Sequence, residues 1–425
     1  MIVADRVYSG IGELATLGVG PVPRRGAAMG ELGVIPEAAF AVRAGRFAWA
    51  GPERALARAV RLPPKRCRVD LGGATVLPGF VDAHTHLLFA GSRHDEVAWK
   101  LSGASYGEIA RRGGGLYSTV RSTRRASAST LLHDATERLH RMLSWGTTTT
   151  EVKSGYALTL SGEARLLSLI PALQRRSPVR IVPTYLAAHA VPPEYAGRAE
   201  AYIDRIISHG IPEVARRGLA RFADVFCEPG FFDVPQSERL LRAAARAGLG
   251  TKIHADEFVA SGGTALAARL PTRSAEHLLA APEGDYAALA ESGVTAVLLP
   301  VTPFAALSAL HSPGRALVEA GVPVALGTDL SPNSWVEGMP FVLSHAVYGA
   351  RMTPAEALTA ATVNSAWAIG EEERAGQVVV GRPADFSVFP VAHSVEIPYR
   401  FGASPSEVYR QGTRVFSRES DRGFK

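Results

Sequence analysis

Five consecutive positions in the first quarter of the chain could hold half of a metal site. Residues 82–86 read Asp-Ala-His-Thr-His, so His84 and His86 are two residues apart. Side chains two apart on a β-strand point to the same side, so both imidazoles can reach one ion. Histidine nitrogen is a common ligand of Zn²⁺. Because an apolar run precedes these residues, we expect a strand that ends in a pair of metal ligands.

Four later residues extend this chemistry. His254 and Glu257 lie close together, and His277 and Asp329 follow, each at or just beyond the end of a short apolar run. His254 can supply a third nitrogen ligand and Asp329 a carboxylate. Such a shell leaves room for a water, whose pKa falls to about 7 on a metal such as Zn²⁺. The pattern therefore predicts metal-assisted hydrolysis, with Glu257 free to move protons.

A scaffold must bring these distant residues together, and the sequence predicts one. Between residues 73 and 370, short apolar runs alternate with helical patterns, which is typical of repeated β-α units. In a (β/α)₈ barrel, catalytic side chains lie at the carboxyl ends of the strands. The candidate residues follow the first, fifth, sixth and eighth strands, as that rule requires. The eight strand candidates are residues 74–84, 146–153, 179–187, 222–228, 250–255, 273–278, 295–300 and 323–329.

The two ends of the chain have a different, β-rich character. Residues 39–51 alternate apolar positions around a turn at Gly45, and residues 376–392 contain two β-rich runs. We expect both ends to form one small β-sandwich domain. The predicted fold class is α/β, a TIM-like (β/α)₈ barrel over residues 73–370 with a small β domain from residues 1–72 and 371–425.

Composition excludes several classes of protein. The 425 residues are 47% hydrophobic and 20% charged, which is typical of a globular chain. No apolar run approaches the roughly 20 residues that span a bilayer, so we expect no membrane partner. Asp5 and Arg6 interrupt the place of a signal peptide, and two Cys residues allow no disulfide framework. These features favour a cytoplasmic protein.

The basic excess raises the question of nucleic acid. The formal net charge is +6. Most of the basic residues are Arg, and they occur in scattered pairs such as Arg124-Arg125 and Arg216-Arg217. A nucleic-acid site needs basic residues gathered on one face and interleaved with aromatic ones. We therefore expect solvated helix faces and no nucleic-acid partner.

Longer segments carry a family resemblance. LPGFVDAHTH (residues 77–86), HADE and GTD resemble the metal-dependent amidohydrolase superfamily. TTTTEVKSGYAL, AAHAVP and DVFCEPGFF are similar to its imidazolonepropionase family, and the similarity covers about residues 70–412. The resemblance implies a barrel with a metal centre, a homodimer, and a small-molecule substrate. It implies hydrolytic opening of the ring of 4-imidazolone-5-propanoate to N-formimidoyl-L-glutamate in histidine degradation.

The same resemblance assigns residues. It implies one zinc or iron ion per chain, with His84, His86, His254 and Asp329 as the ligands. We expect Glu257 to transfer a proton from water to the leaving ring nitrogen, and His277 and Asp329 to orient or deprotonate that water. The guanidinium fork of Arg93 suits the propanoate of the substrate. The substrate contacts that the resemblance implies are Arg93, Tyr156, His189, Glu257, Ser331, Asn333 and Ser334.

Three features bear on the details of the site. Ser331 stands where the family usually has Asn, and its hydroxyl reaches less far. Residues 298–307 lack the usual Gly-Thr pair. Some relatives in the superfamily bridge two metals with a carboxylated Lys. Lys153 ends the second strand candidate and the fourth contains no Lys, which favours one metal.

Other functions fit parts of the pattern. The nearest is a cyclic-amidine deaminase of the same superfamily, acting on guanine-like or cytosine-like rings, because HADE with a later Asp serves deamination equally well. Arg93 and the KSGY segment favour a substrate that bears a carboxylate. A non-enzymatic binding protein on the same barrel predicts missing ligands, and none is missing. Residues 113–115, three Gly, predict a flexible loop near the barrel mouth rather than a nucleotide site.

Overall fold

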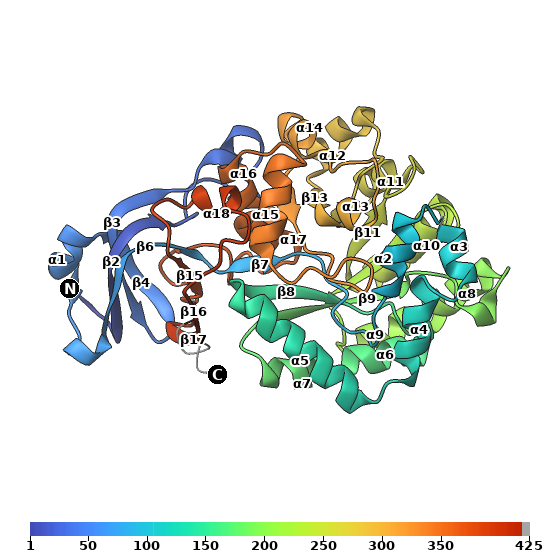
Figure 1. The fold of residues 1–425 in the computed structure, drawn as a ribbon, viewed down its shortest axis with the longest axis horizontal. Coiled ribbons are helices and arrows are strands. Elements are labelled where there is room, and N and C mark those ends of the chain that lie inside the picture. Colours follow the sequence, from blue (N-terminus) through green and yellow to red (C-terminus); the bar gives the residue numbers. More distant parts are fainter. Residues whose placement is uncertain (105, 419–425) are drawn as a thin grey trace.

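A barrel and a separate sheet make up the molecule (Figure 1). The computed structural model describes residues 1–104 and 106–418. Eight parallel strands follow one another around the barrel in chain order. They are β7 (Phe80–Asp82), β8 (Thr147–Lys153), β9 (Arg180–Ala188), β10 (Phe222–Cys227), β11 (Gly250–Ala255), β12 (Thr272–His277), β13 (Thr295–Leu298) and β14 (Val324–Leu326). The predicted eight-stranded parallel barrel is confirmed.

The first and last strands meet through their backbones. The amide of Ala83 donates to the carbonyl of Leu326 (3.3 Å), and the amide of Asp329 donates to the carbonyl of His84 (3.0 Å). These bonds lie just past the ends of β7 and β14. They therefore join the first predicted ligand pair directly to the last predicted ligand.

Helices surround the barrel strands. Ser127 caps the long helix α5 (Ala128–Ser144) by accepting a hydrogen bond from the amide of Thr130, and the apolar side of α5 packs inward. The helices from the barrel region are α2 (Asp95–Leu101), α3 (Tyr106–Arg111), α4 (Leu116–Arg125), α5 (Ala128–Ser144), α6 (Leu160–Ser168), α7 (Ile170–Arg176), α8 (Ala199–Arg205), α9 (Ile211–Arg216), α10 (Val234–Arg246), α11 (Gly263–Arg269), α12 (Tyr286–Ser292), α13 (Val301–Ala305), α14 (Gly314–Glu319), α15 (Met339–Tyr348), α16 (Pro354–Thr359) and α17 (Ser365–Ala368). Two short helices, α1 (Leu56–Ala59) and α18 (Glu396–Tyr399), lie outside that region of the sequence.

The separate sheet combines both ends of the chain, as predicted. Figure 1 shows its blue N-terminal strands beside its red C-terminal strands. The order is β17-β16-β15-β6-β2-β3-β4. The bounds are β2 (Arg6–Ala15), β3 (Val34–Arg43), β4 (Arg46–Pro52), β6 (Arg68–Pro78), β15 (Phe386–Phe389), β16 (Glu407–Arg410) and β17 (Thr413–Ser417), and β1 (Ile2–Val3) pairs separately with β5 (Val60–Arg61).

Two strand predictions need correction. The candidate over residues 74–84 is two strands, because the chain leaves the small sheet after Pro78 and enters the barrel at Phe80. Gly79 makes this crossing, where an added Cβ would lie 2.3 Å from the side chain of Thr148. In residues 376–392 only Phe386–Phe389 is a strand. Gly376 and Gly381, which have positive φ, and Pro383, which has no N–H, lie around the first run and prevent a strand there.

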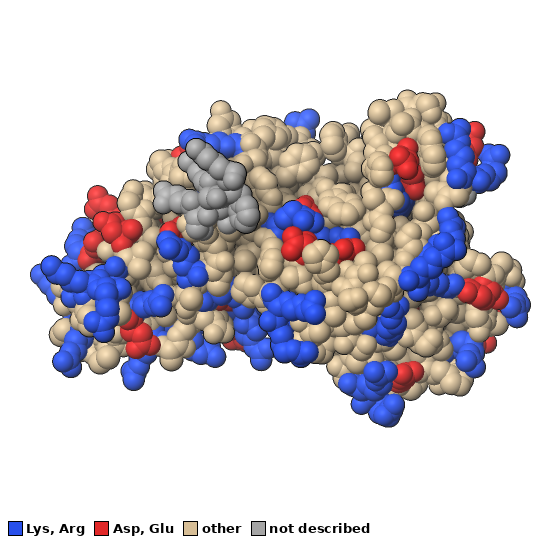
Figure 2. Space-filling model, turned by 60° about the horizontal axis from the view of Figure 1, so that its bottom comes forward, with Lys and Arg blue, Asp and Glu red and all other residues tan. Residues whose placement is uncertain are grey.

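Basic side chains are scattered over the surface. Figure 2 shows Lys and Arg in separate groups across one face, with Asp and Glu among them. Among the described residues, no helix has the length and apolar character to cross a membrane.

Candidate active site

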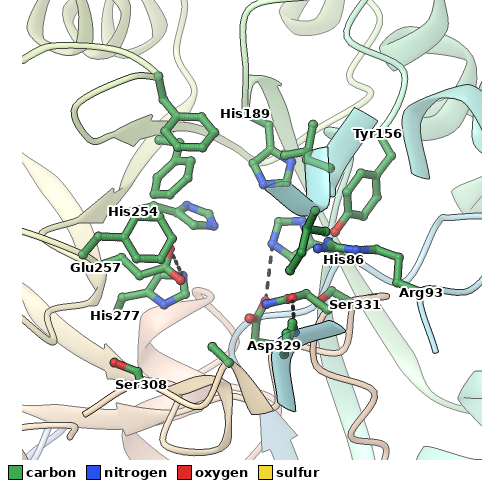
Figure 3. Close-up of a pocket in the computed structure, with 18 of the residues that line it drawn as sticks. His86, Arg93, Tyr156, His189, His254, Glu257, His277, Ser308, Asp329 and Ser331 are labelled. Carbon is green, nitrogen blue, oxygen red and sulfur yellow. Dashed lines mark hydrogen bonds and ion pairs between the residues drawn. The ribbon is translucent and has the colours of Figure 1, made fainter. Parts of the chain in front are cut away.

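A cavity of about 300 Å³ lies where the barrel strands end. In Figure 3, His254, Glu257 and His277 lie on one side of it, and His86, Tyr156 and Arg93 lie on the other. The predicted residues that line it are His86, Arg93, Tyr156, His189, His254, Glu257, His277, Asp329, Ser331 and Asn333. His84 and Ser334 are fully buried and do not line it.

Three predicted ligand atoms have the mutual spacing of atoms around one ion. Nε2 of His84 lies 3.2 Å from Nε2 of His86, and each lies 3.5 Å from Oδ1 of Asp329. Tetrahedral ligands at zinc–nitrogen bond lengths would be about 3.4 Å apart. The donor set of nitrogen and carboxylate oxygen is one that zinc accepts, so these residues fit a metal ion.

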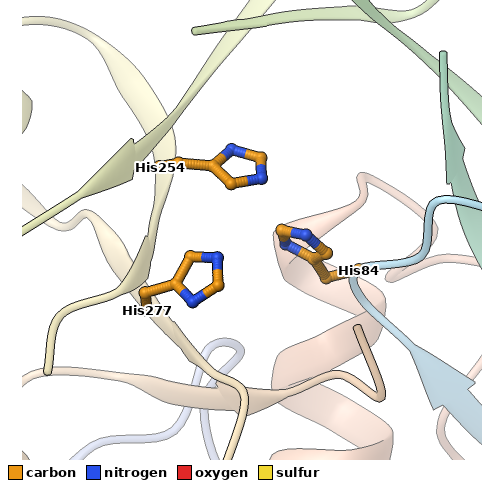
Figure 4. Close-up of side chains that lie close together, drawn as sticks. All are labelled: His84, His254 and His277. Carbon is orange, nitrogen blue, oxygen red and sulfur yellow. The ribbon is translucent and has the colours of Figure 1, made fainter. Parts of the chain in front are cut away.

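His254 approaches the same centre from the opposite side. Its ring centroid lies 4.6 Å from that of His84, and the rings of His84, His254 and His277 converge in Figure 4. These three have ligand atoms within 4.8 Å of one another, as do His84, His86 and Asp329. Nε2 of His254 is buried and has no hydrogen-bond partner among the described residues. His84 belongs to both groups of three, so it links His86 and Asp329 to His254 and His277.

Two buried carboxylates orient the imidazoles. Nδ1 of His84 lies 2.6 Å from Oε2 of Glu276, and Nδ1 of His254 lies 3.0 Å from Oδ2 of Asp224. A carboxylate beside Nδ1 favours the tautomer with the proton there, which leaves the Nε2 lone pair for an ion.

A network of buried ions lies behind these carboxylates. Nζ of Lys153 lies 2.8 Å from both Asp224 and Glu276 and 2.9 Å from Glu151. Nζ of Lys252 lies 2.7 Å from Glu151 and 2.8 Å from Glu276. Burial lowers the pKa of Lys153, yet these three carboxylates together hold it well above its usual value. Lys153 is thus an ammonium ion, whereas a carboxylated bridging lysine would start from the neutral amine.

Glu228, just beyond the end of β10, holds the backbone at Glu257 in place. Glu228 accepts hydrogen bonds from the amides of Glu257 (2.9 Å), Phe258 (3.2 Å) and Val259 (2.9 Å). Burial raises the pKa of Glu257 well above its usual value, and the charges of Asp329 and Glu228 add to the effect. Its Oε2 lies 3.6 Å from Nε2 of His277. A buried carboxyl with a raised pKa can hold and return a proton at this place.

Backbone strain coincides with two of these residues. His277 has φ +71° and Asp329 has φ +51°, in the left-handed region that residues other than glycine rarely adopt. Such conformations cost about 1–3 kcal/mol and cluster at functional sites. The Thr302 hydroxyl donates to Oδ2 of Asp329 (2.9 Å) and holds that carboxylate in place.

The KSGY segment positions two predicted substrate contacts. Nδ1 of His189 lies 3.0 Å from the carbonyl of Gly155, and its ring stacks on His86 at 4.8 Å. Gly155 has φ +115°, and an added Cβ would lie 3.0 Å from that same Nδ1. Burial lowers the pKa of His189 to about 3, so its ring is neutral. Tyr156 is buried next to it, with its ring centroid 5.3 Å away.

Arg93 is already paired in the structure. Its Nε donates to Oε1 of Glu96 (2.9 Å) and its Nη2 to Oε2 (2.7 Å), so Glu96 occupies the bidentate fork. Glu96 also accepts from the amide of Gly115 (2.7 Å). There is no room for a side chain at Gly114, because an added Cβ would lie 2.8 Å from Oε1 of Glu96. The triple-glycine segment therefore supports the Arg93 side of the cavity.

The segment after Asp329 closes another part of the cavity. The Ser331 hydroxyl accepts from the amide of Ser334 (3.2 Å) and so shapes a tight turn. Oδ1 of Asn333 accepts from Nζ of Lys100 (3.0 Å). Ser331 and Asn333 thus line the cavity, whereas Ser334 supports it from behind.

Several residues with roles here were missed at the sequence level. Glu96 and Lys100 follow Arg93 at helical spacing, Glu228 ends the fourth strand candidate, and Glu276 precedes His277. For Glu96, Lys100 and Glu276, and for Lys252 two residues before His254, position near a predicted site residue was the available signal. Asp224 and Glu228 gave no such signal.

Comparison with known proteins agrees with this geometry. A model of the Amidohydrolase family matches residues 107–416. Imidazolonepropionase from Symbiobacterium thermophilum is 47% identical over 400 residues, or 94% of each chain. The one from Geobacillus kaustophilus is 43% identical and covers 91% of this chain and 92% of its own. The structure of 5-methylcytosine deaminase from Klebsiella pneumoniae superposes with TM-score 0.72 at 14% identity, over 97% of both chains, which shows the shared fold alone.

The matched family and the barrel define the chain as a member of the amidohydrolase class. Its identity to the two bacterial relatives extends over nearly the whole chain and is far above what a shared fold alone gives. The chain belongs to the imidazolonepropionase family and is a hydrolase that acts on a cyclic amide.

Proposed function

We propose that the chain hydrolyses the ring amide of 4-imidazolone-5-propanoate and releases N-formimidoyl-L-glutamate. One observation carries the proposal: the cavity has a cation-bearing side at Arg93, across from Glu257 and His277 (Figure 3). A ring that carries a propanoate chain has its charge at one end and its amide at the other. The cavity matches that arrangement of groups.

The metal we propose is a single zinc or iron ion held by His84, His86, His254 and Asp329. The spacing of the ligand atoms and the unpartnered Nε2 of His254 support this set. When bound, the ion supplies Lewis-acid chemistry that activates water and polarises the ring carbonyl.

The residues around the ring divide the remaining work. Tyr156 and His189 contact the ring, while Arg93 binds the propanoate. Glu257 takes a proton from the attacking water and passes it to the ring nitrogen as the amide C–N bond breaks. His277 and Asp329 orient that water. The 3.6 Å contact between His277 and Glu257 supports this arrangement.

A direct assay tests the reaction. The metal-loaded protein should remove the ultraviolet absorbance of freshly generated 4-imidazolone-5-propanoate and form N-formimidoyl-L-glutamate. Guanine and cytosine serve as the comparison substrates, because a deaminase would release ammonia from one of them. Ammonia release without loss of the imidazolone would overturn the proposal.

Metal analysis tests the ligand set. We expect about one zinc or iron ion per chain, and His84→Ala should lose most of it because the two ligand groups share His84. The matched control is His140→Ala, which removes an exposed imidazole on α5 and should retain the metal. Two ions per chain, or full retention by His84→Ala, would contradict the assignment. The homodimer and the cytoplasmic location stay predictions from the sequence.

A further inference from the structure

A second cation lies at the Arg93 side of the cavity. Lys100, on α2, lines the cavity together with Arg93 and is only half-buried. Arg93, Glu96 and Lys100 are spaced three and four residues apart, the spacing that places side chains on one face of a helix. Arg93 thus has a cationic neighbour about two turns further along the chain.

Among the residues that the structure describes, Lys100 forms no ion pair with a carboxylate at this side of the cavity. Glu96 accepts hydrogen bonds from two nitrogens of Arg93 in a bidentate ion pair, and both side chains are buried. That pair is neutral overall. Lys100 donates to Oδ1 of Asn333 (3.0 Å) and to the carbonyl of Ala305 (3.4 Å), and both of these acceptors are uncharged. Lys100 therefore contributes one positive charge beyond the pair.

The ammonium group is fixed and still has capacity to donate. Lysine has three N–H donors, and the two acceptors from Asn333 and Ala305 account for two of them. Both acceptors belong to segments far along the chain from α2, so they hold the Lys100 side chain across the cavity rim. Burial, and then the charge of Arg93, lower the pKa of Lys100. A carboxylate placed here would relieve the repulsion between the two cations.

We propose that Lys100 binds the carboxylate of the substrate and sets the preference for an acidic side chain on the ring. It acts beside Arg93, whose fork is largely taken by Glu96. This inference rests on the proposed function, because it assumes a substrate with a single carboxylate. One negative charge matches the one positive charge of Lys100, which the neutral Arg93–Glu96 pair does not offset.

The test compares two stable ligands that differ only in charge. Imidazole-4-propanoate and its amide, imidazole-4-propanamide, are titrated into the metal-loaded protein by calorimetry. The unaltered chain should prefer the acid. Lys100→Met should weaken binding of the acid by about 10–100-fold, the usual loss for a hydrogen bond to a charged group, and change amide binding less than threefold. Lys65→Met, which removes an exposed lysine, should change neither.

Other outcomes separate the possibilities. Lys100→Arg should keep most of the preference for the acid, because the charge remains, and it replaces Lys100→Met if that variant does not fold. Equal weakening of acid and amide would make Lys100 a structural residue and overturn the inference. So would equal binding of the two ligands by the unaltered chain. If the unaltered chain prefers the acid but does not turn over the imidazolone, the proposed function fails instead.

Discussion

Glu257→Gln should lower kcat by about 10²–10⁴-fold while the metal content stays near one ion per chain. The substitution keeps the size of the side chain and removes its ability to accept and return a proton. The backbone amide of Glu257 still donates to Glu228, so the loop keeps its anchor. Turnover is measured by loss of imidazolone absorbance, and metal by elemental analysis of the same preparation.

Glu291→Gln is the matched control for this variant. Glu291 is exposed on α12, so the same change of charge occurs away from the cavity. Its kcat should equal that of the unaltered chain. Near-full turnover by Glu257→Gln with metal bound would transfer the proton-moving role to His277 or Asp329.

Lys153→Met should lower the free energy of unfolding by about 3–5 kcal/mol, the usual cost of removing one partner from a buried ion pair. The change leaves Glu151, Asp224 and Glu276 with Lys252 as the remaining buried ammonium of the network. Three carboxylates that share one cation repel one another in a medium of low dielectric. The shift is measured by denaturant unfolding of the metal-free protein, so that loss of metal does not contribute.

The control is again Lys65→Met, which deletes the same charge at an exposed position. Surface changes of this kind alter stability by about 0.5 kcal/mol or less. If the two variants unfold at the same denaturant concentration, the network does not contribute as its geometry indicates. A Lys153→Met variant that also binds metal more weakly would connect the network to His84 and His254.

The barrel could be predicted because its signals are local. Most strands are short runs of apolar or β-branched residues between helical segments, and the reactive residues occur at the ends of those runs. One local signal was ambiguous: the apolar run over residues 74–84 does not reveal that the chain changes sheets at Gly79. The reason is that strands of two different sheets have the same apolar pattern, and the crossing depends on contact with Thr148.

The partners of the reactive residues could not be predicted in the same way. Glu276 orients His84 from nearly 200 positions away, and Lys100 meets Asn333 across a similar interval. No periodicity or motif in the sequence relates such pairs. The bidentate ion pair of Glu96 with Arg93 is local in the sequence. How strongly it occupies the Arg93 guanidinium depends on the burial of both side chains.

The sequence by itself determined the class of fold, the family, and the set of residues that reach the carboxyl ends of the strands. Those properties depend on residue type and on spacing along one strand or helix. The tertiary structure alone decided which carboxylate faces which imidazole, that Lys153 is an ammonium ion among three acids, and that Lys100 carries the charge left at the cavity. Burial gives these contacts their strength, and burial is a property of the folded chain.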